Sequence, residues 1–508
     1  MVMTPLLADV AVAVIGAGAM GSGIAHVAAR AGHRVYLYDT NAEAVSRGRA
    51  GIGRDLDFLV GKGRLERAEA DAILERVVPT SRLEDLADAG LAVEAIVEKL
   101  EVKQELFRRL ESLLGADAIL ATNTSSLSIT AIGAALTRPG RLAGLHFFNP
   151  APRMALVEVV SGLATDKPVA EVLYATARAW GKTPVHAGSS PGFIVNRVAR
   201  PYYAEALRVA GERAASPSTL DAILRDGCGF PMGPFELMDL IGHDVNFAVT
   251  RSVFDAYFGD KRFTPSLIQQ ELVLAGRLGR KTGQGFYDYR EGAERPAPVV
   301  EAPSTAGAGV VVAGSAGLLE PLVTRLAAAG VPVERREGPG ELRVDGARLL
   351  LSDGRTATRR AAEEGVPDTM LIDLARDYGK TPRVALARAD QCSAAAYDRV
   401  VGCLQAGGLV VSRLDDVPGL IALRTVAMLA NEAADGAVAG IGTPADIDTA
   451  MRLGTNYPEG PLAWADRIGV ALVARVLGNL KAHYGEERYR VSPLIQRAAC
   501  SGAALASG

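Results

Sequence analysis

The chain has 508 residues, too many for one ordinary domain, and this length predicts about three or four domains. Its composition, with 49% hydrophobic and 22% charged residues, is typical of a globular protein. The formal net charge of -3 at pH 7 argues against a protein that binds the nucleic-acid backbone, because such a protein needs a concentrated basic surface.

The sequence shows no sign of export, membrane insertion or metal binding. No Lys or Arg precedes Arg30, so the basic segment that opens a signal peptide is missing. No apolar run reaches the length of about 18 residues that a membrane span requires. The four cysteines have no metal-ligand spacing and are typical of free thiols in a reducing compartment. We therefore expect a cytoplasmic protein without a membrane span or a bound metal.

Residues 9–40 predict the start of a Rossmann-like, dinucleotide-binding domain. An apolar strand is followed by the GxGxxG turn of Gly16, Gly18 and Gly21, a helix of small residues and a second strand. In such a turn the first glycine permits the tight bend and the second lets the backbone approach a pyrophosphate. The third allows close packing of helix against strand. The simpler alternative is a glycine cluster that serves helix packing alone.

The residue that ends the second strand predicts the choice of cofactor. Asp39 stands 18 residues beyond Gly21, where a carboxylate accepts hydrogen bonds from a ribose diol and repels a 2′-phosphate. Thr40 and Asn41 follow, with no arginine to bind that phosphate. The sequence therefore favours NAD over NADP, although Asp39 as an ordinary surface residue is the alternative.

The next motif, GLHFFNP at residues 144–150, places a histidine in an apolar segment. If this segment and ALVEVV (155–160) are neighbouring strands, Glu158 pairs with His146 and fixes its tautomer. A histidine exchanges protons near neutral pH, so this pair can act as a general base. The alternatives are a core histidine whose hydrogen bonds are satisfied and a charge on an edge strand.

The second half of the chain repeats the first. PGFIVNR at 191–197 returns as PGLIALR at 418–424, 227 residues later, and the register then holds over about fifty residues. Residues 308–337 have a strand–turn–helix–strand pattern but lack GxGxxG spacing. The sequence thus predicts an α/β Rossmann-like domain and an all-α helical domain, followed by a degenerate second copy of both. The expected segments are 1–187 (NAD-binding), 188–290 (helical, for substrate and dimerisation), 291–307 (linker), 308–413 (degenerate Rossmann-like) and 414–500 (second helical).

The second copy is expected to be catalytically silent. We align the GLHFFNP region with residues 381–392, which contain no histidine, and Leu423 stands at the position of Asn196. One active site per chain follows. We expect the two helical domains to pair within the chain, and a homo-oligomer stays open as well.

With these motifs in hand, residues 9–290 resemble an NAD-dependent L-3-hydroxyacyl-CoA dehydrogenase of the β-oxidation type. The segments ATNTSSLSI (121–129), GFPMGPFELMDLIG (229–242) and GRKTGQGFYDY (279–289) add to the resemblance. The doubled layout is similar to the long bacterial members of this family, which act on 3-hydroxyadipyl-CoA in phenylacetate catabolism or on 3-hydroxybutyryl-CoA.

The resemblance implies roles for residues that the sequence alone leaves open. His146 matches the catalytic base and Glu158 its carboxylate partner. Ser125 matches a hydroxyl that contacts cofactor and substrate, and Asn196 an amide that positions the thioester region. A turn hydroxyl or helix cap is the alternative for each of these two. The matching cofactor contacts are Glu98, Lys103, Asn149 and Lys281.

The expected activity is oxidation of a (3S)-3-hydroxyacyl-CoA ester to the 3-oxoacyl-CoA, with hydride passing to NAD. The alternatives are a dehydrogenase of free hydroxy acids or sugar acids and a non-catalytic NAD-binding structural protein. For the CoA tail, Arg54, Lys62 and Arg64 are basic candidates, but a solvated helical face explains them equally well. Arg153, after GLHFFNP, either faces a substrate carboxylate or lies in solvent. Neither a nucleic acid nor a membrane is an expected partner.

Overall fold

A computed structural model of the chain describes residues 4–506. The chain divides into two compact units. The first holds the described residues up to Arg197 together with the segment Ala439–Thr455, and the second holds Val198–Val438 and the described residues from Asn456 onward. The first unit therefore includes a piece of the second sequence repeat.

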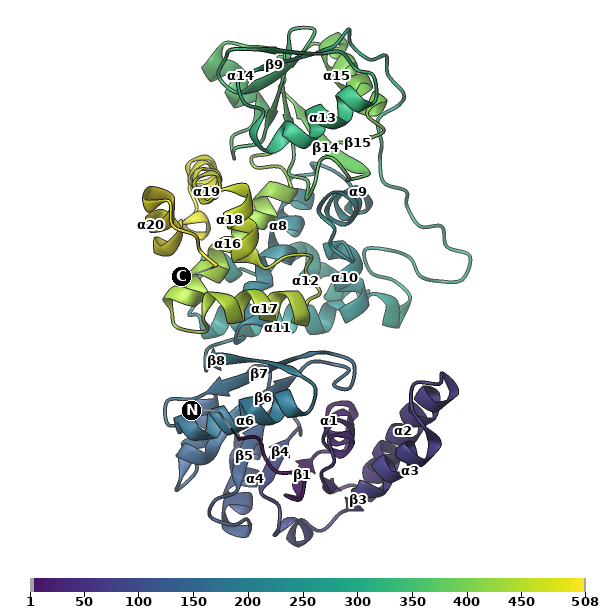
Figure 1. Cartoon of the computed structure of the whole chain (residues 1–508), viewed down its shortest axis with the longest axis vertical. Coiled ribbons are helices and arrows are strands. Elements are labelled where there is room, and N and C mark those ends of the chain that lie inside the picture. The colour runs from purple at the N-terminus through teal and green to yellow at the C-terminus, as the bar shows by residue number, and fades with distance from the viewer. Residues whose placement is uncertain (1–3, 507–508) are drawn as a thin grey trace. The chain divides into compact units, whose positions relative to one another are not determined.

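The first unit is built on an eight-stranded sheet in the order β3-β2-β1-β4-β5-β6-β7-β8 (Figure 1). Neighbouring strands are parallel except β6 and β7, which are antiparallel. The central strands are apolar and fully buried, as expected of a sheet covered on both faces. The strands are β1 (Val12–Ile15), β2 (Val35–Tyr38), β3 (Val77–Thr80), β4 (Leu91–Glu94), β5 (Ile119–Thr122), β6 (Leu142–Phe147), β7 (Leu156–Ser161) and β8 (Thr183–Gly188).

Helices pack on this sheet, and α17 comes from the second sequence repeat. The helices of the unit are α1 (Ala19–Arg30), α2 (Ala42–Gly61), α3 (Arg67–Arg76), α4 (Leu100–Leu113), α5 (Ile129–Gly133), α6 (Lys167–Ala179), α7 (Val195–Val198) and α17 (Pro444–Gly454), with short 3₁₀ turns η1 (Leu83–Leu86) and η2 (Pro139–Arg141). Apolar side chains of α1, α2, α3 and α6 join those of the strands in one buried core.

The second unit contains a seven-stranded mixed sheet in the order β10-β9-β11-β12-β13-β14-β15 (Figure 1). It differs from the first sheet at β11, which runs antiparallel to both neighbours. Its strands are β9 (Val310–Ala313), β10 (Val333–Arg336), β11 (Glu341–Val344), β12 (Ala347–Leu351), β13 (Thr369–Ile372), β14 (Arg383–Arg388) and β15 (Val410–Arg413). Helices α13 (Glu320–Ala328), α14 (Ala357–Glu364) and α15 (Ala394–Ala406) accompany them, with the 3₁₀ turn η6 (Gly317–Leu319).

The rest of the second unit is helical and comes from both copies of the repeat. The first copy supplies α8 (Arg200–Gly211), α9 (Pro217–Ala222), the π-helical turn η3 (Ile223–Gly227), α10 (Pro234–Ile241), α11 (His243–Ala256), η4 (Lys261–Phe263), α12 (Leu267–Leu274) and η5 (Arg280–Thr282). The second supplies α16 (Ala422–Val438), α18 (Pro461–Ile468), α19 (Val470–Tyr484), η7 (Glu487–Tyr489) and α20 (Pro493–Ser501). The structure thus confirms two Rossmann-like sheets accompanied by helical regions.

The two helical copies contact each other inside the second unit. Helix α8 packs on α16, and the buried Arg424 of α16 donates to Glu205 of α8 at 2.6 Å. Phe230 of the first copy lies with its ring centroid 5.1 Å from that of Tyr457 and 5.6 Å from that of Trp464 of the second. Because an unpaired buried charge is costly, the Arg424–Glu205 pair ties the two copies together at one register.

Two expected absences concern the whole described chain. Among residues 4–506, no helix combines the length and apolar character that crossing a bilayer would take. The same residues hold no group of three or more His, Cys, Asp or Glu side chains arranged to bind a metal ion.

Candidate active site

His146 and Glu158 face each other across two neighbouring strands. The antiparallel register of β6 and β7 pairs the two residues directly, and His146 Nδ1 lies 2.6 Å from Glu158 Oε2. Their exposed fractions are only 5% and 0%. The rings of Phe148 and Phe193 lie 4.5 and 5.8 Å from the imidazole, centroid to centroid, and shield it from water. The predicted pair is therefore present, in a dry environment.

The second oxygen of Glu158 receives two backbone hydrogen bonds. Oε1 accepts from the N–H groups of Ile194 and Val195, both at 3.0 Å, at the start of α7. The turn that aims these groups has left-handed backbone at Gly192 (φ 79°) and Phe193 (φ 46°). Hydrogen bonds to both oxygens stabilise the ionised carboxylate and fix its orientation. Glu158 is thus a rigid acceptor for the His146 N–H.

The glycine turn between β1 and α1 has the shape that a dinucleotide requires. A Cβ atom on Gly16 would lie 2.5 Å from the carbonyl oxygen of Ala95, and one on Gly21 would lie 1.7 Å from that of Gly16. Gly16 and Gly21 are therefore needed for packing. At Gly18 a Cβ would meet no heavy atom within 4 Å, so this stretch of backbone is open to a ligand.

A cavity of about 720 Å³ lies beside this turn and contains the Asp39 carboxylate. Asp39 Oδ2 accepts from the N–H of Ala17 and Oδ1 from that of Asn41, both at 2.9 Å. The carboxylate is held at the end of β2, where a ribose diol would find an acceptor. The cavity is lined by Ile15, Gly16, Gly18, Tyr38, Asp39, Thr40, Ala95, Ile96, Val97, Glu101, Val102, Glu105, Leu106 and Arg109. The open glycine backbone, the oriented carboxylate and this apolar wall fit NAD.

Glu98, Lys103 and Ser125 belong to one network. Glu98 Oε1 accepts from the Thr124 hydroxyl at 2.5 Å and from the Ser125 N–H at 3.0 Å. Lys103 Nζ lies 3.3 Å from Glu98 Oε2 and 2.5 Å from Oε1 of the buried Glu94. Burial by itself raises the pKa of Glu98, but the hydrogen bond from Thr124 and the charge of Lys103 outweigh it and lower the pKa.

Sequence reasoning missed two residues that hold this region together. Glu94, fully buried at the end of β4, accepts from Lys103 and from the Thr122 hydroxyl at 2.6 Å. Asn123 accepts the N–H of Phe147, next to His146, at 2.8 Å. An acidic residue that ends an otherwise apolar strand was the available signal for Glu94. The sequence offered no comparable signal for Asn123.

The remaining predicted residues are more dispersed. Ser125 lies on the loop after β5, Asn149 on the exposed loop after β6, and Asn196 within α7, directly after the two N–H groups that bind Glu158. Lys281 belongs to the second unit, where its ammonium pairs with Asp244 at 2.5 Å. It does not line the cavity that contains Asp39, and its cofactor role stays a prediction.

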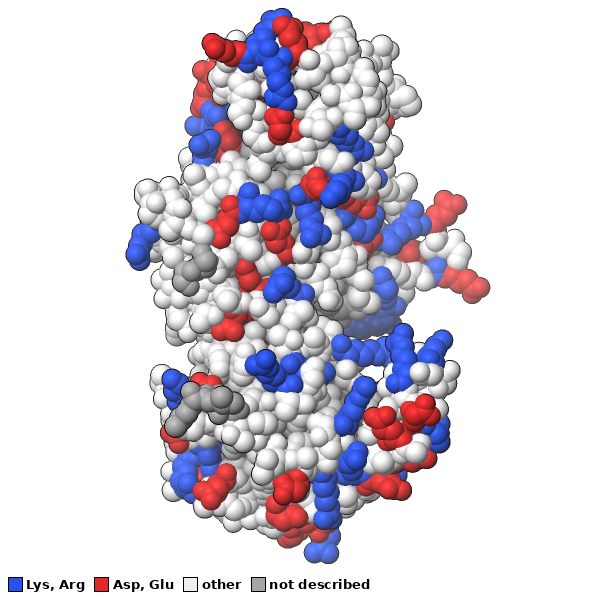
Figure 2. Space-filling model, in the orientation of Figure 1, with Lys and Arg blue, Asp and Glu red and all other residues white. Residues whose placement is uncertain are grey.

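A second cavity of the first unit, of about 530 Å³, lies between α1 and α2 and reaches Asn149. Arg47 and Arg54 line it, whereas Lys62 and Arg64, the other basic candidates for the CoA tail, do not. Figure 2 shows basic and acidic side chains intermixed on the surface over α2 and α3. Two arginines at the rim of a cavity next to the His146 loop suit a phosphate-bearing group.

Models of known protein families match most of the chain. The family model described as "3-hydroxyacyl-CoA dehydrogenase, NAD binding domain" matches residues 11–190, and its "C-terminal domain" model matches twice, at 192–289 and 419–504. A model of the "3-hydroxybutyryl-CoA dehydrogenase reduced Rossmann-fold domain" matches residues 349–418. The chain belongs to the 3-hydroxyacyl-CoA dehydrogenase family. The double match also confirms the internal duplication.

Individual relatives agree with the family. The chain is 47% identical to 3-hydroxyadipyl-CoA dehydrogenase of Escherichia coli K12 over 96% of this chain and 97% of that protein. A probable 3-hydroxybutyryl-CoA dehydrogenase of Deinococcus radiodurans is 43% identical over 54% of this chain and 99% of its own length. A crystal structure of 3-hydroxybutyryl-CoA dehydrogenase from E. coli K12 matches with a TM-score of 0.90 and 46% identity, over 98% of this chain and all of that one. The chain is accordingly an NAD-dependent oxidoreductase that oxidises 3-hydroxyacyl-CoA.

Helix α17 of the second repeat packs on β7 and β8 of the first copy. The Gly188 N–H at the end of β8 donates to the Ile441 carbonyl, just before α17, at 2.7 Å. At the other end of α17, a Cβ on Gly454 would lie 2.8 Å from Leu156 of β7 and 2.9 Å from Val195 of α7. Leu156 stands two residues before Glu158 on β7, and the N–H of Val195 is one of the two that Glu158 binds. The second repeat therefore packs directly behind the His146–Glu158 pair, called the dyad below.

The second sheet contains the counterpart of the dyad, but not at the residues that the sequence analysis aligned. Asp373 follows β13, and its N–H donates to Ala385 of β14 at 3.0 Å. These two residues stand 227 positions after His146 and Glu158. The alignment of the GLHFFNP region with 381–392 was therefore wrong in register, because that segment contains β14, the counterpart of β7. The absence of a histidine stands, since Asp373 occupies its position.

Both carboxylate oxygens of Asp373 accept hydrogen bonds from backbone N–H groups. Its Oδ2 accepts from Ile421 at 2.9 Å and Ala422 at 2.7 Å, and its Oδ1 accepts from Leu423 at 2.9 Å. Ile421 and Ala422 correspond in the repeat to Ile194 and Val195, which bind Glu158. A carboxylate thus meets the same helix start in both copies, but only the first copy places a histidine beside it.

Proposed function

We propose that the chain oxidises the hydroxyl of a (3S)-3-hydroxyacyl-CoA with His146 as general base and Glu158 as its partner. The observation that carries this proposal is the buried 2.6 Å contact between His146 Nδ1 and Glu158 Oε2. With Nδ1–H donating to the carboxylate, Nε2 is the ring nitrogen left to take the hydroxyl proton. The negative charge of Glu158 stabilises the imidazolium that forms.

The proposed cofactor contacts, apart from Lys281, lie in the first unit. The N–H groups at the start of α1, beyond Gly16 and Gly18, face the pyrophosphate, Gly21 keeps α1 close to the turn, and Asp39 accepts from the ribose. Bound NAD supplies the hydride acceptor. The further proposed contacts are Glu98, Lys103, Ser125, Asn149 and Lys281.

Ser125 and Asn196 are proposed to orient the substrate. Ser125 has its backbone fixed by Glu98, and Asn196 directly follows the N–H groups that bind Glu158. Both lie on segments whose backbone is tied to a carboxylate, buried at Glu158 and partly exposed at Glu98, and such ties preserve the geometry that hydride transfer needs. Arg47 and Arg54 are the proposed neighbours of the CoA phosphates, because they line the cavity that reaches Asn149.

For the substrate we propose a short-chain ester, either 3-hydroxyadipyl-CoA or 3-hydroxybutyryl-CoA. A curated protein and a crystal structure from E. coli K12, each matching nearly the whole chain, carry these two names. Arg153 is exposed on the loop after β6 and is the candidate to meet the terminal carboxylate of the adipyl ester. A butyryl ester has no such group.

The test measures NAD reduction with both esters at pH 7, in the native chain and in Arg153→Ala. A clearly higher kcat/KM for the adipyl ester that falls in Arg153→Ala, with the butyryl value unchanged, supports recognition of a terminal carboxylate. A higher kcat/KM for the butyryl ester identifies a general short-chain enzyme. Binding of NAD without turnover of either ester would overturn the proposed substrates.

A further inference from the structure

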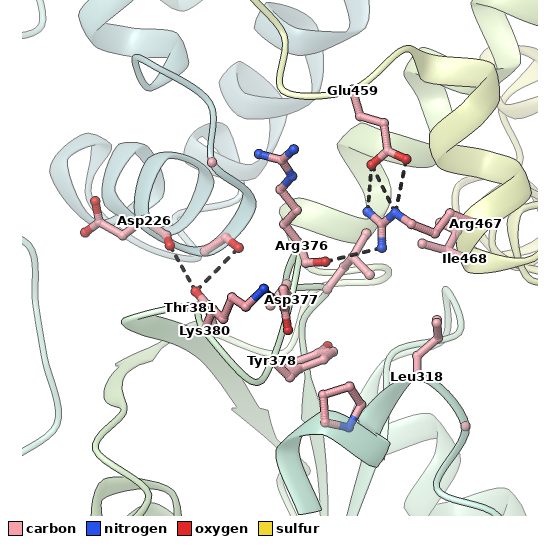
Figure 3. A pocket seen from close by; sticks show the side chains of 16 residues that line it. Asp226, Leu318, Arg376, Asp377, Tyr378, Lys380, Thr381, Glu459, Arg467 and Ile468 are labelled. Atoms are coloured by element: carbon pink, nitrogen blue, oxygen red, sulfur yellow. Dashed lines mark hydrogen bonds and ion pairs between the residues drawn. The ribbon is translucent and has the colours of Figure 1, made fainter. Parts of the chain in front are cut away.

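The second unit contains a cavity of about 950 Å³ that none of the proposed active-site residues lines (Figure 3). It lies between the loop that follows β13, the turn before α13 and loops of both helical copies. Its lining residues are Asp226, Gly227, Gly229, Gly317, Leu318, Pro321, Leu374, Ala375, Arg376, Asp377, Tyr378, Lys380, Thr381, Glu459, Arg467 and Ile468.

The cavity lies beside the counterpart of the catalytic loop. The segment Leu374–Lys380 stands 227 positions after Phe147–Arg153, the segment that follows His146. The nearby Asp373 carboxylate accepts four backbone N–H groups and has no imidazole beside it, so it is not available as a base. The degenerate copy thus has a cavity at this place but no histidine that could act as an acid or base. Such a cavity is suited to binding rather than to catalysis.

Among the charged side chains that line this cavity, one cation has no acidic partner in the described part of the chain. Three acidic residues of the lining are each paired with a base: Asp226 with Arg383 at 3.1 Å, Asp377 with Lys380 at 3.4 Å and Glu459 with Arg467 at 2.9 Å. Arg376 has no carboxylate within ion-pair distance among residues 4–506. Figure 3 shows the Glu459–Arg467 pair and, apart from it, the extended Arg376 side chain.

Arg376 is held in place by contacts from both helical copies. Its N–H donates to Gly227 at 2.9 Å, and its carbonyl accepts from Arg467 at 3.2 Å. Its side chain donates one hydrogen bond, to the Pro458 carbonyl at 3.1 Å, and lies against Gly229, where a Cβ would be 3.3 Å from Nη1. The guanidinium therefore keeps most of its N–H donors while its position is fixed. Such preorganisation reduces the entropic cost of binding.

We propose that this cavity binds a small organic anion through Arg376. A planar guanidinium matches the geometry of a carboxylate or phosphate, and it is the charge in the lining that lacks an acidic partner. Leu318, Pro321 and Ile468 offer apolar surface for the body of the ligand. The site would be a second ligand site of the chain, separate from the His146 dyad and independent of the proposed substrate.

Tryptophan fluorescence can report on this cavity specifically. The chain has two tryptophans, and Trp464 lies with its ring centroid 5.8 Å from the guanidinium carbon of Arg467, a residue of the lining. In a full-length Trp180→Phe chain, emission therefore arises from Trp464 alone. The probes are adipate, inorganic phosphate and CoA, which separate a carboxylate from a phosphate and a bare anion from one with an organic body.

We expect a saturable change of Trp464 emission with adipate or CoA, with a midpoint at least roughly tenfold higher in Arg376→Ala, since loss of a charged hydrogen bond costs about 1.5–3 kcal/mol. Arg376→Lys should recover part of the affinity. Arg475→Ala, which removes an exposed arginine of α19 outside the lining, should behave like the parent chain. Saturation by adipate alone identifies a carboxylate site, and saturation by CoA and phosphate a phosphate site. No saturable change with any probe, or equal midpoints with and without Arg376, would overturn the proposal.

Discussion

The two copies of the sheet domain solve the same structural problem with different residues. In the first copy Glu158 binds the N–H groups at the start of α7 and His146 lies beside it. In the second, Asp373 binds the corresponding start of α16 directly from the position of the histidine, and Ala385 stands where Glu158 would be. The fold needs a carboxylate at this helix start, whereas the chemistry needs an imidazole between carboxylate and substrate.

The two copies also exchange helices. In the second unit, η3 of the first repeat contacts β14, with Asp226 paired to Arg383 at 3.1 Å. In the first unit, α17 of the second repeat contacts β7 and β8. Gly454 at the end of α17 lies close to Leu156, which is the counterpart of Arg383. At this strand position the contact to the helix is polar in the second copy, through Arg383, and apolar in the first, through Leu156. The second copy therefore keeps this contact between helix and sheet although it has no counterpart of His146.

The largest expected difference between the copies concerns the base. His146→Ala should lower turnover by roughly 10²–10⁴, because a positioned general base contributes about that factor. The affinity for NAD should hardly change, since the imidazole lies outside the glycine turn. Steady-state kinetics and NAD titration check both parts. Turnover close to that of the native chain would remove His146 from the role of base.

The matched change in the silent copy is Asp373→Asn. It weakens the hydrogen bonds to the start of α16 and should lower the stability of the second unit. Turnover at a temperature where the chain stays folded should be essentially unchanged. A loss comparable to that of His146→Ala would mean that the second copy takes part in catalysis.

A smaller effect is expected where α17 touches the working copy. In Gly454→Val the new side chain would meet Leu156, two residues before Glu158, and Val195, whose N–H Glu158 binds. Such overpacking should cost about 1–3 kcal/mol of stability. By displacing the dyad it should also lower kcat, roughly 10–100-fold.

Gly478→Ala serves as the control for this change, because a Cβ there meets no heavy atom within 4 Å. It should leave both stability and kcat near their native values. If Gly454→Val kept native kcat with the same loss of stability, α17 would support the fold but not the geometry of the dyad.

The smallest expected effect is a pH dependence of stability in the first unit. Hydrogen bonds and Lys103 lower the pKa of Glu98 in the folded chain, so the unfolded chain binds more protons and stability rises with pH. This contribution is present above the ordinary carboxyl pKa of about 4.3 and is lost as pH falls through the lower folded value. The difference in urea unfolding free energy between the native chain and Glu98→Gln should therefore stay nearly constant from pH 7 to about 5 and shrink as the pH is lowered further, towards about 3. A constant difference would contradict the assigned shift.

Much of this site could be predicted from the sequence because its residues lie in local patterns. The GxGxxG turn, Asp39 and the His146 strand each follow from spacing and alternation within short segments. Glu158 was placed correctly because two consecutive strands joined by a short loop are neighbours in space. Glu98 and Lys103 are near each other in sequence, and the family resemblance supplied their roles.

Long-range contacts could not be predicted in the same way. No local sequence pattern indicates that α17 packs on β7 and β8, or that the Asn123 side chain accepts a hydrogen bond from the N–H of Phe147. The misaligned second copy has a related cause. In the second copy, Asp373 stands in place of His146 and Ala385 in place of Glu158. The two residues that would have shown how this segment aligns with the first copy are therefore absent.

The central claim is that one copy works and the other is structural, and the number of NAD molecules bound per chain tests it most directly. Isothermal titration of the full-length chain should give one NAD per chain, because the second turn lacks the GxGxxG spacing. Gly18→Val, which fills the open stretch of backbone in the first turn, should abolish that binding. Two NAD molecules per chain, or one that survives Gly18→Val, would contradict the account.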